Sequence, residues 1–548
     1  MMRRIRLSIL AALCVLATLA GVAGSEPLAA SAATWTPISG SGSTWSQNAL
    51  DQWRRNVASN YGMTVNYSGT GSSAGRRDFI NQTVDFAVSE IPFQAHPEDG
   101  SAPESPTTGY AYMPIVAGGT SFMYNLTIGG KRVTNLRLGG ETVTKIFTGV
   151  ITNWNDPQIQ KDNPGLAMPN KAIVPVTRSD GSGSTAQFTL WMSKQYSSLW
   201  NAFCAKVGRP VPCGLTSQYP SYSGFKAQSG SLGVAGYVSQ NYGDGSINYV
   251  EYSYALKSGF PVAKVLNAAG YYIEPTASSV AVALLKAQID TNKGTANYLT
   301  QILDGVYNNP DPRTYPLSSY SYMIVPTQVA GIFTEAKGKT LSAFANYFLC
   351  EGQQQAGTLG YSPLPMNLVL AGFDQIKLIP GAQASNVDIN SCHNPTFKPG
   401  DSPNSNQLAV TAPQPAACDK QGTSQCNTGT AGAANTPTVT SGSGTGGASA
   451  GASGGGSGAA AAAGGAAAGA ADTAAGATAD GSASGLDGAS ATAIGGTGAR
   501  ATPYALADDS WSSRQVVMLL AAVLLLAAIV LPPVLFRRLR LPGRASKD

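Results

Sequence analysis

Three short turns rich in Gly, Ser and Thr each lead into a predicted helix, and this repeated pattern constrains the fold most strongly. The second and third turns also follow apolar runs that predict buried strands. A helix that begins at such a turn presents free N–H groups and the positive end of its dipole to one point, which favours an anion. We therefore predict that the three turns converge on one oxyanion. The turns span residues 40–45, 70–75 and 178–184, and the helices that follow them are predicted at residues 47–56, 76–82 and 185–193.

Charged side chains near these turns extend the prediction. Arg178 supplies a planar cationic donor, and Asp180 is placed to orient it. Glu90 ends a predicted buried strand at residues 84–91. A buried carboxylate can accept a hydrogen bond from protonated phosphate, whereas fully ionised sulfate would face it as an unpaired charge at a cost of several kcal/mol. The alternative interpretation of Glu90 is a strand-end carboxylate that is exposed or paired with a base.

The two ends of the chain predict export and membrane attachment. Three arginines precede an apolar stretch at residues 7–23, and small residues continue to Ala32, which predicts a signal peptide at residues 1–32. Residues 516–536 carry no charge and are long enough to cross a bilayer as a helix, with a buried soluble helix as the alternative. The basic tail at residues 537–548 indicates a cytoplasmic C-terminus, with the preceding chain outside the cell.

Between these ends, helical and strand patterns alternate from about residue 34 to residue 394, which predicts an α/β domain at residues 33–395. A cysteine-containing extension follows at residues 396–428. Residues 429–510 consist mainly of Gly, Ala, Ser and Thr, and such a composition cannot bury enough apolar surface to form a core. We therefore expect a globular head on a disordered tether.

Six cysteines remain after removal of the signal peptide, and an even number in an exported chain predicts disulfides. Proximity in the sequence favours Cys204–Cys213 and Cys418–Cys426, which leaves Cys350–Cys392, although six cysteines allow fifteen pairings.

Several function classes are excluded by composition. The exported portion is close to neutral and has no basic stripe, so we expect no nucleic-acid partner. The only histidines, His96 and His393, lie away from any cysteine pair at ligand spacing, so we expect no metal site. Ser182 lacks a base that could activate it as a nucleophile, and the chain is predicted to be no enzyme and to need no cofactor.

Six motifs then establish a resemblance, because they occur in the order found in the extracytoplasmic phosphate-binding proteins of ABC-type phosphate uptake systems. The resemblance covers roughly residues 34–379 and implies a two-lobed, hinged α/β fold that closes on inorganic phosphate and delivers it to an ABC permease. It implies a first lobe at about residues 34–113 and 277–380 and a second at 114–276, with crossovers near Pro114 and Pro275. The motifs are GSGSTW at 40–45, VNYSGTGSSAG at 65–75, TVDFAVSEIP at 83–92, NWNDPQIQKDNPGLAMP at 153–169, RSDGSGSTAQFT at 178–189 and INYVEYSYA at 247–255.

The resemblance also implies a set of phosphate-binding residues. Glu90 stands where the family usually has an Asp that accepts the phosphate proton, which is the main departure from the family pattern. Trp45 replaces a Phe that uses only its amide, and Ser184 replaces a Thr but keeps the hydroxyl. The predicted phosphate-binding residues are Thr44, Trp45, Ser72, Glu90, Arg178, Asp180, Ser182, Gly183 and Ser184.

The sequence thus predicts a membrane-tethered, extracellular phosphate-binding protein of an ABC transporter. The alternative is a cell-surface sensor or adhesin that keeps the same fold but binds another oxyanion or no ligand.

Overall fold

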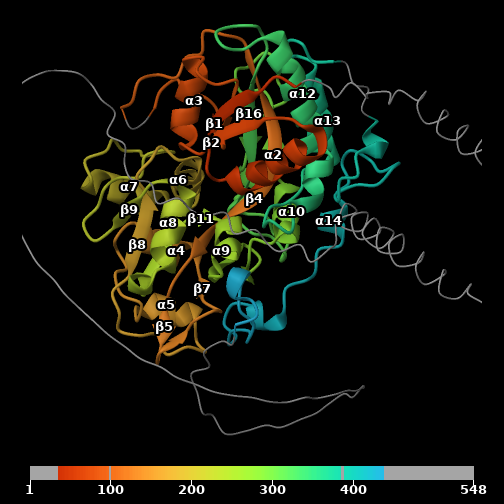
Figure 1. The fold of residues 1–548 in the computed structure, drawn as a ribbon. Coiled ribbons are helices and arrows are strands. Elements are labelled where there is room, and N and C mark those ends of the chain that lie inside the picture. The colour runs from red at the N-terminus through yellow and green to blue at the C-terminus, as the bar shows by residue number, and fades with distance from the viewer. Residues whose placement is uncertain (1–34, 98–99, 384–387, 437–548) are drawn as a thin grey trace, which may run out of the picture. The chain divides into compact units, whose positions relative to one another are not determined.

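The computed structural model describes residues 35–97, 100–383 and 388–436, which all belong to one compact unit (Figure 1). The predicted signal peptide, most of the predicted linker, the predicted membrane segment at 516–536 and the basic tail lie outside the described residues. Within the described part, no helix is both long and apolar enough to cross a membrane.

The centre of the fold is a mixed sheet that runs through both lobes. Its strands follow the order β13-β12-β4-β16-β3-β1-β2, with β11 and β7 added at β4 and β12. The pairs β1–β2 and β1–β3 are parallel, whereas β16 is antiparallel to β3 and β4. The strands of this sheet are β1 Ile38–Gly42, β2 Val65–Ser68, β3 Phe86–Ser89, β4 Tyr110–Met123, β7 Arg137–Leu138, β11 Val250–Glu251, β12 Val262–Leu266, β13 Tyr272–Ile273 and β16 Ser318–Pro326.

The first lobe contains the β2 side of this sheet and its helices, in the upper half of Figure 1. Helix α3 packs against β3 and β1, and α12 packs against α2 and α13. The apolar side of α2 buries Leu50, Trp53 and Val57, the face predicted from the spacing of its apolar residues. The helices are α2 Gln47–Tyr61, α3 Ser72–Ile80, α10 Ala277–Leu284, α11 Asp304–Tyr307, α12 Glu335–Leu349 and α13 Met366–Ile376, with a small hairpin of β14 Gln288–Ile289 and β15 Gln301–Ile302.

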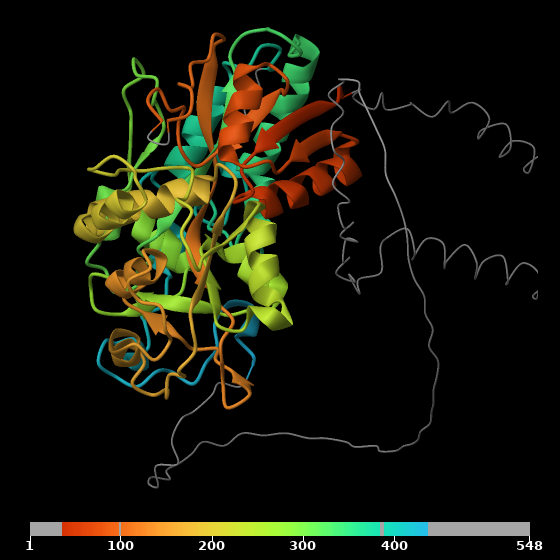
Figure 2. The same ribbon diagram turned by 90° about the vertical axis from the view of Figure 1, so that its left-hand side faces the viewer.

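The second lobe, in the lower half of Figure 1, has a parallel sheet of its own in the order β10-β8-β9. In Figure 2 its yellow-green helix and its lowest, orange elements lie below the red strands of the first lobe. Its further elements are β5 Thr127–Ile128, β6 Lys131–Arg132, β8 Val174–Arg178, β9 Lys226–Gln228, β10 Ser246–Asn248, α4 Gly140–Phe147, α5 Pro157–Asp162, α6 Gly183–Gln195, α7 Ser197–Lys206, α8 Gly230–Ser239 and α9 Tyr252–Ser258.

Strand β4 is the first connection between the lobes. It pairs with β16 from Tyr110 to Gly119 and then with β11 and β12 from Thr120 onward. The change of partner therefore comes later than the crossover predicted near Pro114. Pro114 has no N–H to donate, and it lies instead at a bulge where the register with β16 shifts.

The second connection passes through Pro275, between β13 and α10. It touches the first connection, because a Cβ placed on Gly119 would lie 2.5 Å from the Cβ of Pro275. The absence of a side chain at Gly119 is what lets the two connections pass this closely. The two-lobed α/β fold predicted from the resemblance is thus present.

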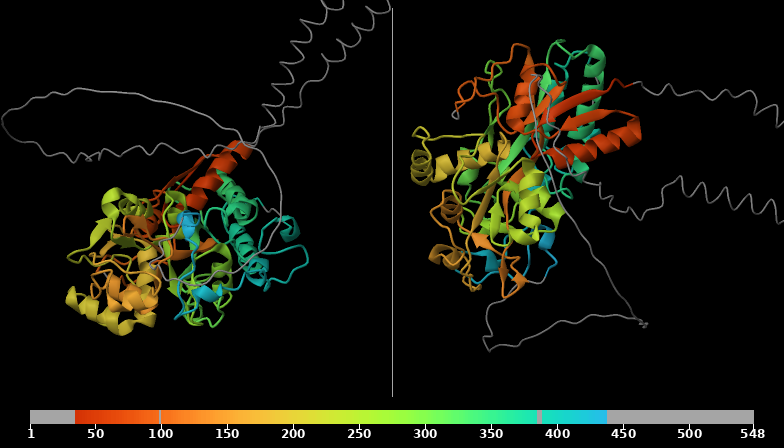
Figure 3. Two further views of the ribbon diagram at one scale, coloured as in Figure 1. Left: turned by 90° about the horizontal axis from the view of Figure 1, so that it is seen from below. Right: turned by 60° about the vertical axis from the view of Figure 1, so that its left-hand side comes forward.

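Residues 388–436 form a C-terminal extension that makes a third connection. Helix α14 Gln407–Val410 packs against α10, and the blue segment in Figure 1 continues to the second lobe. There the half-buried side chain of Lys264 forms an ion pair with the buried Asp419 at 2.8 Å. Both ends of the extension are thus fastened, one to each lobe. The views from below and from the side in Figure 3 show the same course.

The start of the linker predicted at residue 429 is wrong, because residues 429–436 belong to the folded unit. Thr430 and Ala433 are fully buried. The Thr430 hydroxyl donates to the carbonyl of Val262 at 2.6 Å, and the Ala431 N–H donates to the Glu274 carboxylate at 2.6 Å. These long-range partners compensate for a composition that has few apolar side chains.

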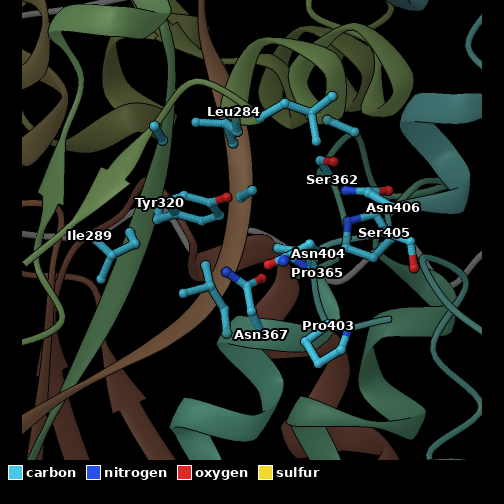
Figure 4. A pocket seen from close by; sticks show the side chains of 16 residues that line it. Leu284, Ile289, Tyr320, Ser362, Pro365, Asn367, Pro403, Asn404, Ser405 and Asn406 are labelled. Atoms are coloured by element: carbon cyan, nitrogen blue, oxygen red, sulfur yellow. The ribbon is translucent and has the colours of Figure 1, made fainter. Parts of the chain in front are cut away.

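The extension also forms one wall of a cavity of about 310 Å³ beside α10 and α13 (Figure 4). Residues 403–406 of the extension face Leu284, Tyr320 and Asn367 across it. None of the predicted phosphate-binding residues lines this cavity.

The structure contains the three predicted disulfides. They join Cys204 to Cys213, Cys350 to Cys392 and Cys418 to Cys426. The second disulfide fastens the start of the extension to the end of α12, and the third closes a loop within the extension.

Candidate functional site

The three predicted Gly/Ser/Thr turns follow the ends of β1, β2 and β8 and lead into α2, α3 and α6. Helix α3 begins at Ser72 instead of residue 76, because Gly71 takes a positive φ of 93° and turns the chain directly into the helix. Helix α6 begins at Gly183 instead of residue 185. Both earlier starts bring predicted binding residues into the first turn of a helix, where N–H groups have no partner within the helix.

The turns of the two lobes meet directly. The Gly183 N–H donates to Ser72 Oγ at 3.0 Å, and the Ser73 N–H donates to the Gly181 carbonyl at 3.0 Å. A Cβ on Gly183 would lie 1.8 Å from Glu90 Oε2 and 2.7 Å from Ser72 Oγ. Any other residue at position 183 would therefore separate the two lobes at this point.

Glu90 lies at the centre of this contact and is 1% exposed. Its two carboxylate oxygens accept hydrogen bonds from Ser72 Oγ and Ser321 Oγ, both at 2.9 Å. Burial raises the pKa of Glu90, and the hydrogen bonds from Ser43, Ser321 and Ser72 together with the charge of Arg178 offset only part of this effect. The alternative interpretation of Glu90 as an exposed carboxylate is wrong.

Arg178 and Asp180 form the predicted pair. Arg178 Nε donates to Asp180 Oδ1 at 2.7 Å, and Nη2 donates to Oδ2, so the guanidinium is held by a two-pronged contact. Burial raises the pKa of Asp180, but the hydrogen bonds and charge of Arg178 outweigh burial and hold that pKa below its usual value. The third nitrogen, Nη1, points to Ser231 Oγ at 3.3 Å.

Thr44 and Trp45 stand at the turn before α2. Thr44 Oγ1 lies 2.9 Å from Ser231 Oγ, so this first-lobe residue also contacts the second lobe. The Trp45 N–H donates to Ser43 Oγ at 3.0 Å, while the indole is buried and donates to Thr120 Oγ1 at 3.3 Å. The side chain of Trp45 thus belongs to the core, and the use of its amide by a ligand stays a prediction.

Ser182 and Ser184 differ in the roles of their hydroxyls. Ser182 Oγ accepts a hydrogen bond from the Thr185 N–H at 3.2 Å and caps the N-terminus of α6. Ser184 Oγ is buried and has no hydrogen-bond partner among the described residues. A buried hydroxyl without a partner is costly, so Ser184 is the clearest donor that this cluster offers to a ligand.

Two contact residues were missed by sequence reasoning. Ser231 follows the turn Ser229-Gly230 at the start of α8, and this is the same Gly/Ser signal that identified the other three turns. Ser321 lies inside β16 among aromatic residues, and only the pairing of β16 with β3 brings it to Glu90. No local signal could have found Ser321.

Comparison with known proteins shows which family this chain is similar to. A family model described as PBP superfamily domain matches residues 27–351. The phosphate-binding protein PstS of Xylella fastidiosa strain Temecula1 is 32% identical over 335 residues, which cover 61% of this chain and 82% of that protein. PstS of Pasteurella multocida is 32% identical over 336 residues, covering 61% and 87%, and PstS 2 of Mycobacterium tuberculosis is 30% identical over 329 residues, covering 59% and 82%.

Proposed function

The chain belongs to the PBP superfamily and, within it, to the family of phosphate-binding proteins, and on this premise we propose that it captures inorganic phosphate between its two lobes. The proposed ligands are the predicted residues at the turns before α2, α3 and α6, together with Glu90 and Arg178. Closure of the hinge buries the anion, and the closed form delivers it to the permease of an ABC transporter. The role is transport, without a chemical reaction.

The observation that carries this proposal is the meeting of Ser72, Glu90 and Gly183. Two helix N-termini, one from each lobe, meet beside one buried carboxyl group, where the Gly183 N–H donates to Ser72 Oγ and the Ser72 hydroxyl donates to Glu90. Donors alone would accept any oxyanion, whereas a carboxylate beside them requires an anion that still carries a hydrogen. Protonated phosphate meets this requirement at neutral pH and sulfate does not. The buried Ser184 hydroxyl, which has no hydrogen-bond partner among the described residues, supplies a further donor.

We further propose that the head works outside the cell on a tether formed by the chain beyond Thr436. The support comes from the sequence: an apolar segment at residues 516–536 followed by a basic tail. The competing function is a sensor or adhesin with the same fold that binds another oxyanion or none.

Thermal unfolding of ligand-stripped, full-length protein with phosphate and with sulfate tests the binding proposal. A ligand present at 100 times its dissociation constant adds about 2.7 kcal/mol to the stability of the native state. We expect phosphate to raise the melting temperature and sulfate to leave it unchanged. If neither anion raises the melting temperature, the transport proposal is contradicted. If both anions raise it equally, the role given to Glu90 is contradicted.

A further inference from the structure

A fourth Gly/Ser turn reaches the same cluster of residues. Gly230 takes a positive φ of 69° and starts α8, and its N–H donates to Asp180 Oδ1 at 2.9 Å. Ser231 follows within the first turn of the helix and is fully buried. The turn therefore contacts the carboxylate that orients Arg178.

Ser231 joins a residue of one lobe to a residue of the other. Its N–H donates to Thr44 Oγ1 at 3.0 Å, and the two hydroxyl oxygens lie 2.9 Å apart. Its Oγ also accepts from Arg178 Nη1 at 3.3 Å. One small side chain thus fixes the distance between the guanidinium of the second lobe and the first-lobe turn before α2.

Tyr254 holds the same turn from another side. This residue lies in α9 of the second lobe, and its hydroxyl donates to the main-chain carbonyl of Thr44 at 2.5 Å. The side chain of Thr44 is therefore held by Ser231 and its carbonyl by Tyr254. Both contacts cross between the lobes, so moving the two lobes apart would break both.

We propose that Ser231 and Tyr254 form a latch that keeps the lobes closed on the anion, acting as positioning residues through Thr44 and Arg178. The inference rests on the proposed phosphate-binding function. The latch contacts that hold the lobes together also aim the Thr44 turn and Arg178 at one point. A weakened latch therefore releases the anion faster, while the encounter of the anion with the open form is unaffected.

The test compares phosphate association and release in the full-length wild type, Ser231→Ala and Tyr254→Phe. Each variant is expected to release phosphate about tenfold faster, with an association rate within about twofold of wild type. Ser239→Ala is the matched control, because Ser239 ends the same helix and its hydroxyl donates only to the Gly236 carbonyl at 3.1 Å. Its two rates are expected to match those of the wild type. A variant with a merely structural defect would have a lower melting temperature in the absence of phosphate. Its association rate and its release rate would then both change.

A double-mutant comparison with Thr44→Val tests the coupling directly. Because Thr44→Val removes the partner hydroxyl, Ser231→Ala is expected to add less than about threefold to the release rate in that background. If the effects of the two substitutions on the release rate multiply, or if neither Ser231→Ala nor Tyr254→Phe changes that rate, the latch is contradicted. Phosphate binding by the wild type would not be contradicted by either result. A wild type that binds no phosphate would instead remove the proposed function, and the latch with it.

Discussion

The anion-binding turns and the C-terminal extension both rely on a largely buried ion pair, but the two pairs have different roles. Arg178 and Asp180 lie two positions apart, and the pair orients a cation toward the meeting point of the lobes. Lys264 and Asp419 are far apart in the sequence, and the pair attaches the extension to β12. The comparison teaches that the same interaction positions a donor when it is local and fastens a segment when it is long-range.

The largest expected effect is on the binding side of this comparison. Arg178→Ala removes the cation and leaves Asp180 without its charged partner, so phosphate affinity should fall by about a hundredfold or more, as calorimetry can measure. Lys194→Ala is the control, because Lys194 lies in α6 of the same lobe and its pair with Asp304 joins side chains that are 48% and 57% exposed. Such pairs contribute about 0–1 kcal/mol, and unchanged binding is expected. An Arg178→Ala variant with wild-type affinity would mean that the site lies elsewhere.

The matching change in the extension should affect stability alone. Lys264→Ala leaves Asp419 buried without its partner, and we expect the free energy of unfolding to fall by about 3 kcal/mol. Phosphate affinity should stay within about twofold of wild type, because neither residue contacts the anion-binding turns. Urea unfolding and calorimetry measure the two quantities. A large loss of affinity would show that the extension and the site are not separate in function.

Glu90→Gln tests the binding side of the comparison in a second way. The buried Glu90 carboxyl is expected to lower the stability of the phosphate-free protein, whereas the ion pair of the extension is expected to raise it. Burial raises the pKa of Glu90, so ionising this carboxyl is less favourable in the folded chain than in the unfolded chain. The wild type should therefore become less stable than Glu90→Gln as the pH rises through this raised pKa. Melting temperatures without phosphate should favour the variant at about pH 7 and coincide at about pH 4, below the ordinary pKa of Glu. Equal stability at both pH values would contradict the burial effect.

The smallest expected effect comes from Ser184→Ala. The hydroxyl is buried and has no partner among the described residues, so its removal should stabilise the phosphate-free protein by about 1 kcal/mol. Phosphate affinity should nevertheless fall about tenfold, because one donor to the anion is lost. If affinity does not change, the hydroxyl does not face the ligand.

Prediction from the sequence succeeded where the signal was local. The three turns and Arg178–Asp180 are contiguous motifs, and they occur where the sequence placed them. The start of α3 was misplaced because the positive φ of Gly71, which lets the helix begin at Ser72, is not visible in the sequence. The contact between Ser321 and Glu90 requires the pairing of strands that are distant in the sequence. Such contacts can be known only after the topology is known.

The extension was the hardest region to predict for the same reason. Residues 429–436 have the composition of a linker, yet Thr430 and Ala431 pair with residues of β12 and with Glu274. The buried guanidinium of Arg137 shows how such a segment is held: it donates to the carbonyls of Cys418 at 2.9 Å and Thr423 at 2.6 Å. Nothing in the composition of the extension reveals these partners.

The attachment of the extension to the second lobe has a mechanical consequence. Tension applied to the chain at Thr436 would first load the hydrogen bonds from the Gly432 N–H to the Phe260 carbonyl and from the Ala431 N–H to Glu274, and then the contact of Thr430 with β12. From there the load would reach helix α9, which packs against residues 431–433 and carries Tyr254. A head pulled from this end would therefore bear strain first in the lobe that supplies Arg178 and Tyr254 to the proposed site.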